Sequence, residues 1–240
     1  AQTAKQVIMQ RLRDAERTNI YNEFIEYENE IMTGVVDRQD FRYVYVNLGK
    51  IVAGMTKQDQ IPTEEYLPDQ RIKVLVSKVD NTTKGPLIFV SRTHPDLLKR
   101  LFEQEVPEIY EEIIEIRNIA REAGSRSKVA VYSNDENLDV KGACIGRNGM
   151  RIQNIIDELC GEKIDIVLWN EDITEFVKNA LNPAEVLSVE IIEEGEENMK
   201  VARVLVAENQ LSLAIGKKGQ NSRLAARLCG VKIDIHTEPA

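Results

Sequence analysis

Two short glycine loops constrain the fold of this chain more than any other feature of its 240 residues. Residues 145–149 read Ile-Gly-Arg-Asn-Gly and residues 215–219 read Ile-Gly-Lys-Lys-Gly. Each loop is followed by nearly the same octapeptide, since residues 159–166 and 228–235 are identical at seven of eight positions. Self-similarity at a fixed period predicts that one structural unit occurs twice. The loops are 70 residues apart and the octapeptides 69, so the second copy has lost one residue in the intervening helix or at its end.

The glycines at both ends of such a loop have a physical reason. Glycine tolerates positive φ and has no Cβ, so a Gly-x-x-Gly turn between two helices brings its backbone close to a ligand. That backbone lies at the N-terminus of the next helix, where free N–H groups and the helix dipole favour an anion such as phosphate. The two middle residues point outward, and they are Arg147 with Asn148 and Lys217 with Lys218.

The charge around both loops is opposite to that of the whole chain. With 31 basic and 40 acidic residues the formal net charge is −9, which alone argues against a nucleic-acid partner. The segments between Asp139 and Asp157 and between Glu208 and Asp234 nevertheless contain no acidic residue. A polyanion responds to the field at the contact surface, so these two windows can bind one. Their basic residues are Lys141, Arg147, Arg151, Lys217, Lys218, Arg223, Arg227 and Lys232.

The two units resemble tandem KH domains, a family that binds single-stranded nucleic acid. The resemblance rests on a Gly-x-x-Gly loop between two helices, a three-stranded sheet around it, and a second copy of the same arrangement. It implies that each loop clamps about four backbone nucleotides of a single strand. The RNA-binding residues that we predict in the two units are Lys141, Ile145, Gly146, Arg147, Asn148, Gly149, Arg151, Ile215, Gly216, Lys217, Lys218, Gly219, Arg223 and Arg227.

These residues are expected to have different tasks. The loops, Arg151 and Arg223 hold the RNA backbone, and the second loop binds phosphate more strongly because it has two lysines. Ile145 and Ile215 either line the grooves for the bases or belong to the core. The link between the units, residues 169–172, is short, so we expect the two copies to pack closely and to form one extended platform.

The chain before the KH units begins with a predicted helix over residues 3–25. Its apolar residues recur at three- and four-residue spacing, and Lys5, Arg11, Arg13 and Arg17 occupy the remaining surface. These basic residues are either a contact for RNA or RNA polymerase, or the solvated face of a connector helix, which is the interpretation that we favour.

From residue 30 to residue 92 the hydrophobic period changes to two, which is typical of strands. The predicted strands cover residues 30–38, 41–48, 50–56, 70–79 and 87–92, with turn signals between them. Five short strands in this length predict an OB-type β-barrel.

Alternation in the second strand places Val44, Val46 and Leu48 inside the barrel and three aromatic rings outside. Those rings, Phe41, Tyr43 and Tyr45, are predicted to stack single-stranded bases, and the alternative is that they pack against a neighbouring domain. The segment resembles the RNA-binding OB repeat of the largest small-subunit ribosomal protein, with Gly34-Val35-Val36 at its start. It departs from that repeat at Arg42-Tyr43, where Phe-Gly is usual, and it has no histidine in the third strand.

The predicted elements of the KH units follow one plan. In the first unit they are helices over 97–105 and 107–123, a strand over 129–132, helices over 140–145 and 150–159, and a strand over 163–169. In the second unit they are a helix over 173–181, strands over 185–192 and 199–206, helices over 211–215 and 221–228, and a strand over 231–236. The acidic segment 193–198 is read as a solvated hairpin turn rather than as a metal site.

The predicted fold is therefore α+β and multidomain, with a connector helix in 1–25, an OB barrel in 26–93, and bacterial-type (type II) KH domains in 94–170 and 171–240. The three cysteines lack metal-ligand spacing, and Cys160 and Cys229 occupy equivalent positions, so we expect small buried packing residues. We predict no cofactor and no metal. No run of residues approaches the ~20 apolar residues of a membrane span, and we expect a cytoplasmic monomer that binds no membrane.

The order of these modules resembles the NusA family of bacterial transcription elongation, termination and antitermination factors. The resemblance covers essentially all 240 residues. It implies binding of nascent RNA behind a paused polymerase, with RNA polymerase and other antitermination factors as partners and no enzymatic activity. It also implies an RNA-polymerase-binding domain ahead of the connector helix, and we expect this sequence to be a fragment that lacks it.

Three other functions remain open at this point. An RNA-processing nuclease or GTPase with KH domains is disfavoured, because the sequence has no Gly-x-x-x-x-Gly-Lys-Ser/Thr loop and no carboxylate cluster spaced for two metals. A ribosome-associated KH protein is less consistent with the preceding barrel. A protein adaptor whose KH folds no longer bind RNA would suit the overall acidity, but the basic windows oppose it.

Overall fold

The computed structural model describes residues 3–238, which form two compact units. The first unit is Ala1–Leu101 and the second is Phe102–Ala240. Residues 1, 2, 239 and 240, the outermost positions of the first and last predicted domains, lie outside the described residues. Each unit is described by itself.

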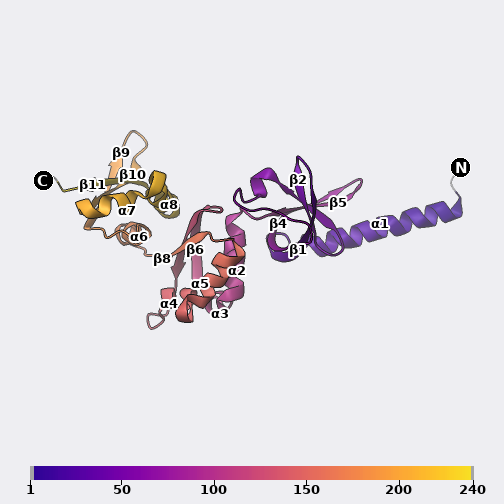
Figure 1. The fold of residues 1–240 in the computed structure, drawn as a ribbon, viewed down its shortest axis with the longest axis horizontal. Coiled ribbons are helices and arrows are strands. Elements are labelled where there is room, and N and C mark those ends of the chain that lie inside the picture. Colours follow the sequence, from indigo (N-terminus) through magenta and orange to yellow (C-terminus); the bar gives the residue numbers. More distant parts are fainter. Residues whose placement is uncertain (1–2, 239–240) are drawn as a thin grey trace. The chain divides into compact units, whose positions relative to one another are not determined.

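The first unit contains helix α1 (Ala4–Ile25) and a closed barrel with the strand order β1-β2-β3-β5-β4 (Figure 1). This result confirms the predicted five-stranded barrel. The two last strands run further than predicted, because they continue to a two-residue turn at 83–84. The strands are β1 (Ile31–Gln39), β2 (Tyr43–Asn47), β3 (Val52–Thr56), β4 (Arg71–Thr82) and β5 (Gly85–Ser91).

The barrel core has the predicted contents and one addition. Val44 and Val46 are almost completely buried inside it, as the alternation in β2 predicts. Phe24, near the end of α1, is also buried in this core, so the C-terminal half of the helix packs on the barrel. The apolar residues in the N-terminal half of α1 are not buried in this core, since Ile8 and Leu12 are 58% and 56% exposed.

The second unit contains two copies of one α/β arrangement (Figure 1). In each copy, the first two strands are antiparallel and the third is parallel to the middle strand, with the orders β6-β7-β8 and β11-β10-β9. Helix α2 (Pro95–Glu105) crosses the boundary between the two units. After it, the first copy consists of α3 (Pro107–Tyr110), β6 (Glu115–Glu122), β7 (Arg126–Tyr132), α4 (Val140–Ile145), α5 (Met150–Glu158) and β8 (Lys163–Leu168). The second consists of α6 (Ile173–Ala180), β9 (Ser188–Glu194), β10 (Met199–Val206), α7 (Leu211–Ile215), α8 (Gln220–Cys229) and β11 (Lys232–Thr237).

The predicted helix over residues 107–123 is wrong. The helix α3 ends at Tyr110, Glu112 adopts a positive φ of 62°, and the chain continues as strand β6. Strand β6 forms an antiparallel ladder with β7 across the turn at Gly124. The glutamates suggested a continuous helix, but pairing with β7 and burial of Ala120 decide the structure.

The missing residue of the second copy lies at the end of the helix after the loop. Helix α5 has nine residues and is followed by four linking residues, 159–162, whereas α8 has ten and is followed by two, 230–231. The longer link turns through Cys160, which has a φ of 56° and is exposed, so its predicted burial is wrong. The other two cysteines are less accessible, and burial raises the pKa of both Cys144 and Cys229 to about 12.

The two KH copies share a hydrophobic core, as the short link between them predicts. Val167 of the first copy packs in one cluster with Phe176 and Leu224 of the second. Hydrogen bonds join the copies around this core. They run from Lys128 Nζ to the Asn182 carbonyl (2.9 Å), from Asn118 Nδ2 to the Leu228 carbonyl (2.8 Å), and from Gln220 Nε2 to Ser125 Oγ (2.7 Å).

Glu162 is the single position at which the repeated octapeptides differ, and it is the centre of a buried polar network. Its carboxylate pairs with Arg121 at 3.0 Å, and both side chains are completely buried. It also accepts hydrogen bonds from Ser127 Oγ (2.9 Å) and from the N–H of Gly124 (2.7 Å). The strand registers place Ile191, Ala202 and Val231 at the positions of Arg121, Ser127 and Glu162 in the second copy. The whole polar set is therefore replaced by apolar residues there.

This replacement leads to a test of stability. We expect Glu162→Val alone to lower the free energy of unfolding by roughly 3–5 kcal/mol, because it removes the carboxylate that pairs with the buried Arg121 guanidinium. The triple variant with Arg121→Ile and Ser127→Ala should recover most of that loss, since it removes the buried guanidinium charge together with its carboxylate partner. Urea unfolding of both variants measures the difference. A single variant as stable as the original protein would mean that the network adds nothing to the fold.

Candidate nucleic-acid interface

The two glycine loops have the same backbone conformation. Gly146 and Gly216 open the loops with φ/ψ of 80°/171° and 78°/171°. Gly149 and Gly219 close them with 72°/14° and 74°/13°. All four φ values are positive, which L side chains adopt only with strain. The repeat is therefore conserved between the copies at the level of each dihedral angle, although the middle residues differ.

The middle residues point into solvent. Arg147, Asn148, Lys217 and Lys218 are all exposed. The second middle residue of each loop is left-handed, with a φ of 55° at Asn148 and 54° at Lys218. Asparagine visits this region readily and lysine does not, so the second loop keeps an extra positive charge at a position that costs backbone energy.

Each loop presents the start of a helix to this surface. The N-cap residues of α5 and α8 are Gly149 and Gly219, which have no side chain to accept hydrogen bonds from the first helical N–H groups. The first of these N–H groups, those of Met150 and Gln220, already donate to the Arg147 and Lys217 carbonyls, so each helix start favours an anion mainly through the positive end of its dipole. The exposed basic residues stand beside the same helix ends, so charge and geometry favour phosphate together.

Arg151 and Asn221 occupy equivalent positions, and each hydrogen-bonds to the helix that precedes its loop. Arg151 Nη1 donates to the Ala143 carbonyl at 2.7 Å, and Asn221 Nδ2 donates to the Ala214 carbonyl at 3.0 Å. Each bond ties the helix after the loop to the helix before it. Asn221 is 1% exposed, and nothing in its residue type marked it as important in the sequence. Only its position two residues after Gly219, where the first copy has Arg151, could have shown its role.

Both arginines that were expected to hold RNA phosphates already have protein partners. Arg151 pairs with Glu108 at 2.9 Å, and Arg223 pairs with Glu122 at 2.7 Å. Arg223 Nη1 also donates to the Lys218 carbonyl at 3.0 Å, inside the second loop. The two carboxylates were not identified from the sequence. They hold the arginine side chains next to the loops. The Arg151 and Arg223 side chains remain 31% and 40% exposed.

The remaining predicted residues of the KH units lie at different distances from the loops. Ile145 and Ile215 are the last residues of α4 and α7, directly before the loops, and Ile215 is 38% exposed. That exposure favours the groove over the core for Ile215. Lys141 is at the other end of α4. Arg227 is in the last turn of α8, roughly 12 Å of helix rise from Gly219, so the structure does not bring it to the loop.

The barrel places its three predicted aromatic residues in different surroundings. Phe41 precedes β2 and is 76% exposed, with Arg42 near its ring. Tyr43 packs against the Tyr45 and Phe89 rings, at centroid distances of 5.8 and 6.4 Å. Arg38 stacks over Tyr45 at 4.1 Å. The three residues therefore form a partly packed surface from which the Phe41 ring projects.

Asp40 holds the turn that carries Phe41. Its carboxylate accepts hydrogen bonds from the N–H groups of Tyr43 and Arg42 and from the Tyr45 hydroxyl. These bonds hold the pKa of Asp40 below its ordinary value, with that of Tyr43 as the largest cause. The bend at residues 41–42 results from this cap, and it explains why β2 starts at Tyr43 rather than at Phe41 as predicted.

Within residues 3–238, no three His, Cys, Asp or Glu side chains are grouped so that they could hold a metal ion. None of the helices in that range combines the length and the apolar character needed to cross a membrane.

Comparison with known proteins gives matches along the whole chain. Residues 92–169 match the family model of the NusA-like first KH domain, and residues 173–240 match that of the NusA-like second KH domain. The chain is 58% identical over 238 residues to the transcription termination/antitermination protein NusA of Bacillus subtilis. It is 52% identical over 240 residues to the protein of that name from Thermus thermophilus and 48% identical over 243 residues to the one from Mycobacterium tuberculosis.

These relatives are longer than the present chain. The matches cover 98–100% of this sequence but 63%, 60% and 69% of the Bacillus, Thermus and Mycobacterium proteins. The chain thus spans a little under two thirds of the first two relatives.

The loop glycines differ in how closely they are surrounded, which gives a test. A Cβ added at Gly216 would lie 2.7 Å from the backbone nitrogen of Asn221, whereas at Gly219 the nearest atom would be Arg223 Nη1 at 3.9 Å. We expect Gly219→Ala to cost about 1–2 kcal/mol of stability from its positive φ alone. Gly216→Ala should cost at least twice as much, because backbone must move as well. Thermal unfolding compares the two, and equal losses would show that Asn221 does not confine the loop.

Proposed function

The chain belongs to the NusA family of transcription termination/antitermination proteins, and on that premise we propose that its residues form the single-stranded RNA-binding part of such a protein. The observation that carries this proposal is the pair of glycine loops with the same backbone conformation, each with exposed side chains at its centre and a helix N-terminus after it. Phosphates of the RNA lie on the loop backbones. Bases lie in the grooves next to Ile145 and Ile215.

We further propose a role in transcription for the whole protein. Binding of nascent RNA would let it modulate pausing, termination and antitermination by RNA polymerase, in the cytoplasm and with other antitermination factors as partners. The chain would act as a monomer without catalysis. Its proposed domains are the connector helix in 1–25, the barrel in 26–93, and the KH domains in 94–170 and 171–240.

A protein adaptor that has lost RNA contact is the main alternative from another class. Two observations favour RNA. Both loops keep glycine at both positive-φ positions, although an adaptor has no need for an open backbone that a ligand can approach closely. Lys218 also keeps a charged side chain at a left-handed position, where asparagine would be easier. A retained strain without a ligand has no evident physical reason.

The second loop provides the direct test of RNA binding. We expect Lys217→Gln with Lys218→Gln to weaken binding of a short unstructured RNA about tenfold, because two charge-assisted contacts to phosphate are lost. The slope of log K against log salt should fall by up to about 1.4, at roughly 0.7 for each contact. Fluorescence anisotropy at several salt concentrations measures both quantities.

Lys200→Gln with Arg203→Gln is the matched control, because it removes the same charge from two exposed residues of β10. This control should bind nearly as the original protein does. Equal affinity for all three proteins would contradict the loop assignment. No binding by the original protein at low salt would contradict RNA binding altogether.

The barrel surface gives a separate prediction. If Phe41 stacks a base, Phe41→Ala should weaken RNA binding by about 1–3 kcal/mol in a titration of the full chain. Leu87→Ala is the control, since Leu87 is another half-exposed apolar residue on a barrel strand, at 50% exposure. If the two variants bind equally well, the aromatic residues serve packing only.

A further inference from the structure

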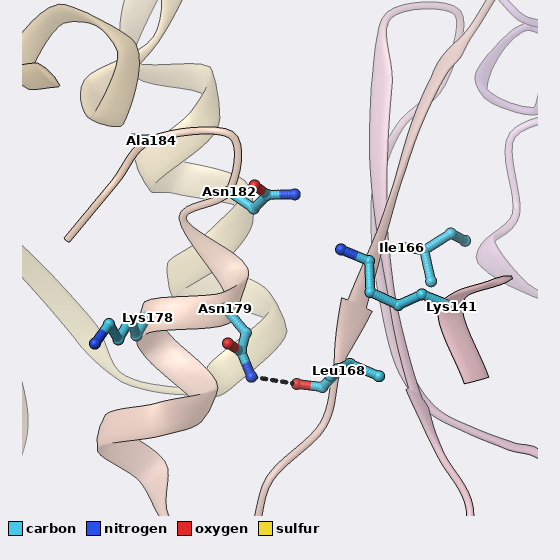
Figure 2. A pocket seen from close by; sticks show the side chains of 7 residues that line it. All are labelled: Lys141, Ile166, Leu168, Lys178, Asn179, Asn182 and Ala184. Atoms are coloured by element: carbon cyan, nitrogen blue, oxygen red, sulfur yellow. Dashed lines mark hydrogen bonds between the residues drawn. The ribbon is translucent and has the colours of Figure 1, made fainter. Parts of the chain in front are cut away.

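A cavity of about 160 Å³ lies inside the second unit, between the two KH copies. Its walls come from α4 and β8 of the first copy and from α6 and the residues after it in the second (Figure 2). The apolar part consists of Ile166, Leu168 and Ala184, and the polar part includes Lys141, Asn179 and Asn182. No acidic side chain lines it, in a chain with a net charge of −9.

The size of the cavity limits what it can hold. Sites for independent small molecules usually have about 300–1,000 Å³ and bury most of their ligand. A space of 160 Å³ is better suited to one planar ring of a larger ligand that is held elsewhere. Its composition agrees, because apolar walls with a few directed polar groups are what a nucleobase needs.

Asn182 is held in place by its backbone, so that its side chain is free for a ligand. The Asn182 carbonyl accepts a hydrogen bond of 2.9 Å from Lys128 Nζ, whose side chain is completely buried. The preceding carbonyl, of Leu181, accepts one of 3.0 Å from the buried Asn221. The Asn182 side chain itself is exposed and points toward the first copy (Figure 2).

A second donor meets this amide across the cavity. The ammonium group of Lys141 points toward Asn182 from the opposite wall (Figure 2). Asn179 donates a hydrogen bond of 3.1 Å to the Leu168 carbonyl, which holds its side chain against β8. Two donors, Lys141 Nζ and Asn182 Nδ2, thus converge on one space, and a group with two adjacent acceptors would satisfy both.

Residues that line the cavity, or that contact its lining, lie next to both glycine loops. Lys141 precedes Gly146 on the same helix by roughly 7.5 Å of rise. On the other side, Asn221 contacts Leu181, next to Asn182, and stands directly against Gly216 of the second loop. An extended strand that binds to one loop and continues to the other would therefore pass this opening.

We propose that this cavity takes one base of the RNA where the strand passes from the first KH domain to the second, and that guanine fits best. Guanine presents O6 and N7 as adjacent acceptors, which the Lys141 ammonium and the Asn182 amide can donate to, while Ile166 and Leu168 contact the ring. This inference rests on the proposed binding of single-stranded RNA. It adds a site of base selection between two sites that hold the backbone.

The experiment places one abasic residue at each position of a bound RNA in turn. A set of otherwise identical oligonucleotides, each with one abasic residue at a different position, is titrated against the full chain. One position between the segments protected by the two loops should lose affinity about tenfold. At that position the four bases are then compared, and guanine should bind best. An abasic residue keeps its phosphate, so a cavity that held phosphate would show no such position.

Variants connect this position to the cavity. With Asn182→Ala and with Lys141→Met, the penalty at that position and the preference for guanine should disappear, while the loop variants weaken all oligonucleotides alike. Lys178→Met is the matched control, because Lys178 borders the same cavity but points away from it (Figure 2). It should retain the preference.

The outcomes separate this inference from the proposed function. If the original protein binds no RNA, the proposed function fails and the inference fails with it. If RNA binds, and the loop variants weaken it, but no position responds to Asn182→Ala or another base is preferred, only the cavity assignment is overturned.

Discussion

The arrangement of the two KH copies depends on one buried ammonium group. Lys128 Nζ lies between Asp165 and the Asn182 carbonyl, at 2.9 Å from each, and so joins the sheet of the first KH copy to the turn after α6 of the second. Burial lowers the pKa of Lys128, and the carboxylate of Asp165 opposes that shift. The free-energy cost of removing such a charge from water is offset only by partners at hydrogen-bonding distance. The Lys128 ammonium group therefore tolerates little change in the positions of Asp165 and the Asn182 carbonyl, and this restriction fixes how the two copies pack together.

The two copies keep one loop conformation with different supports. The hydrogen bond from the helix after the loop to a carbonyl of the helix before it is donated by an arginine in the first copy and by a buried asparagine in the second. Glu162 and its donors form a polar network where the second copy has only apolar side chains. In both supports the buried N–H groups and the buried charges have partners, although the side-chain oxygen of Asn221 accepts no hydrogen bond. Backbone geometry is thus the shared property of the repeat, and side-chain chemistry is free to differ around it.

Several features of the site were accessible from the sequence because they are local. A glycine pair with basic residues between it needs no distant partner to adopt its turn, and an alternating strand such as β2 shows its buried face in its own residues. Features that depend on distant partners were missed. They include the pairing of β6 with β7 in place of a helix, and the carboxylates of Glu108 and Glu122 that hold Arg151 and Arg223.

The sequence by itself determined the repeated unit, the barrel, the two loops and the basic windows around them, because periodicity, glycine conformation and local charge act over a few residues. Only the tertiary structure decided how the copies meet, which arginines are already paired, and that a cavity opens between Lys141 and Asn182. These properties arise from contacts between residues some 40 to 100 positions apart in the chain, such as Lys128 with Asn182 and Glu122 with Arg223. Such contacts are selected by the packing of the whole core, and no local pattern records them.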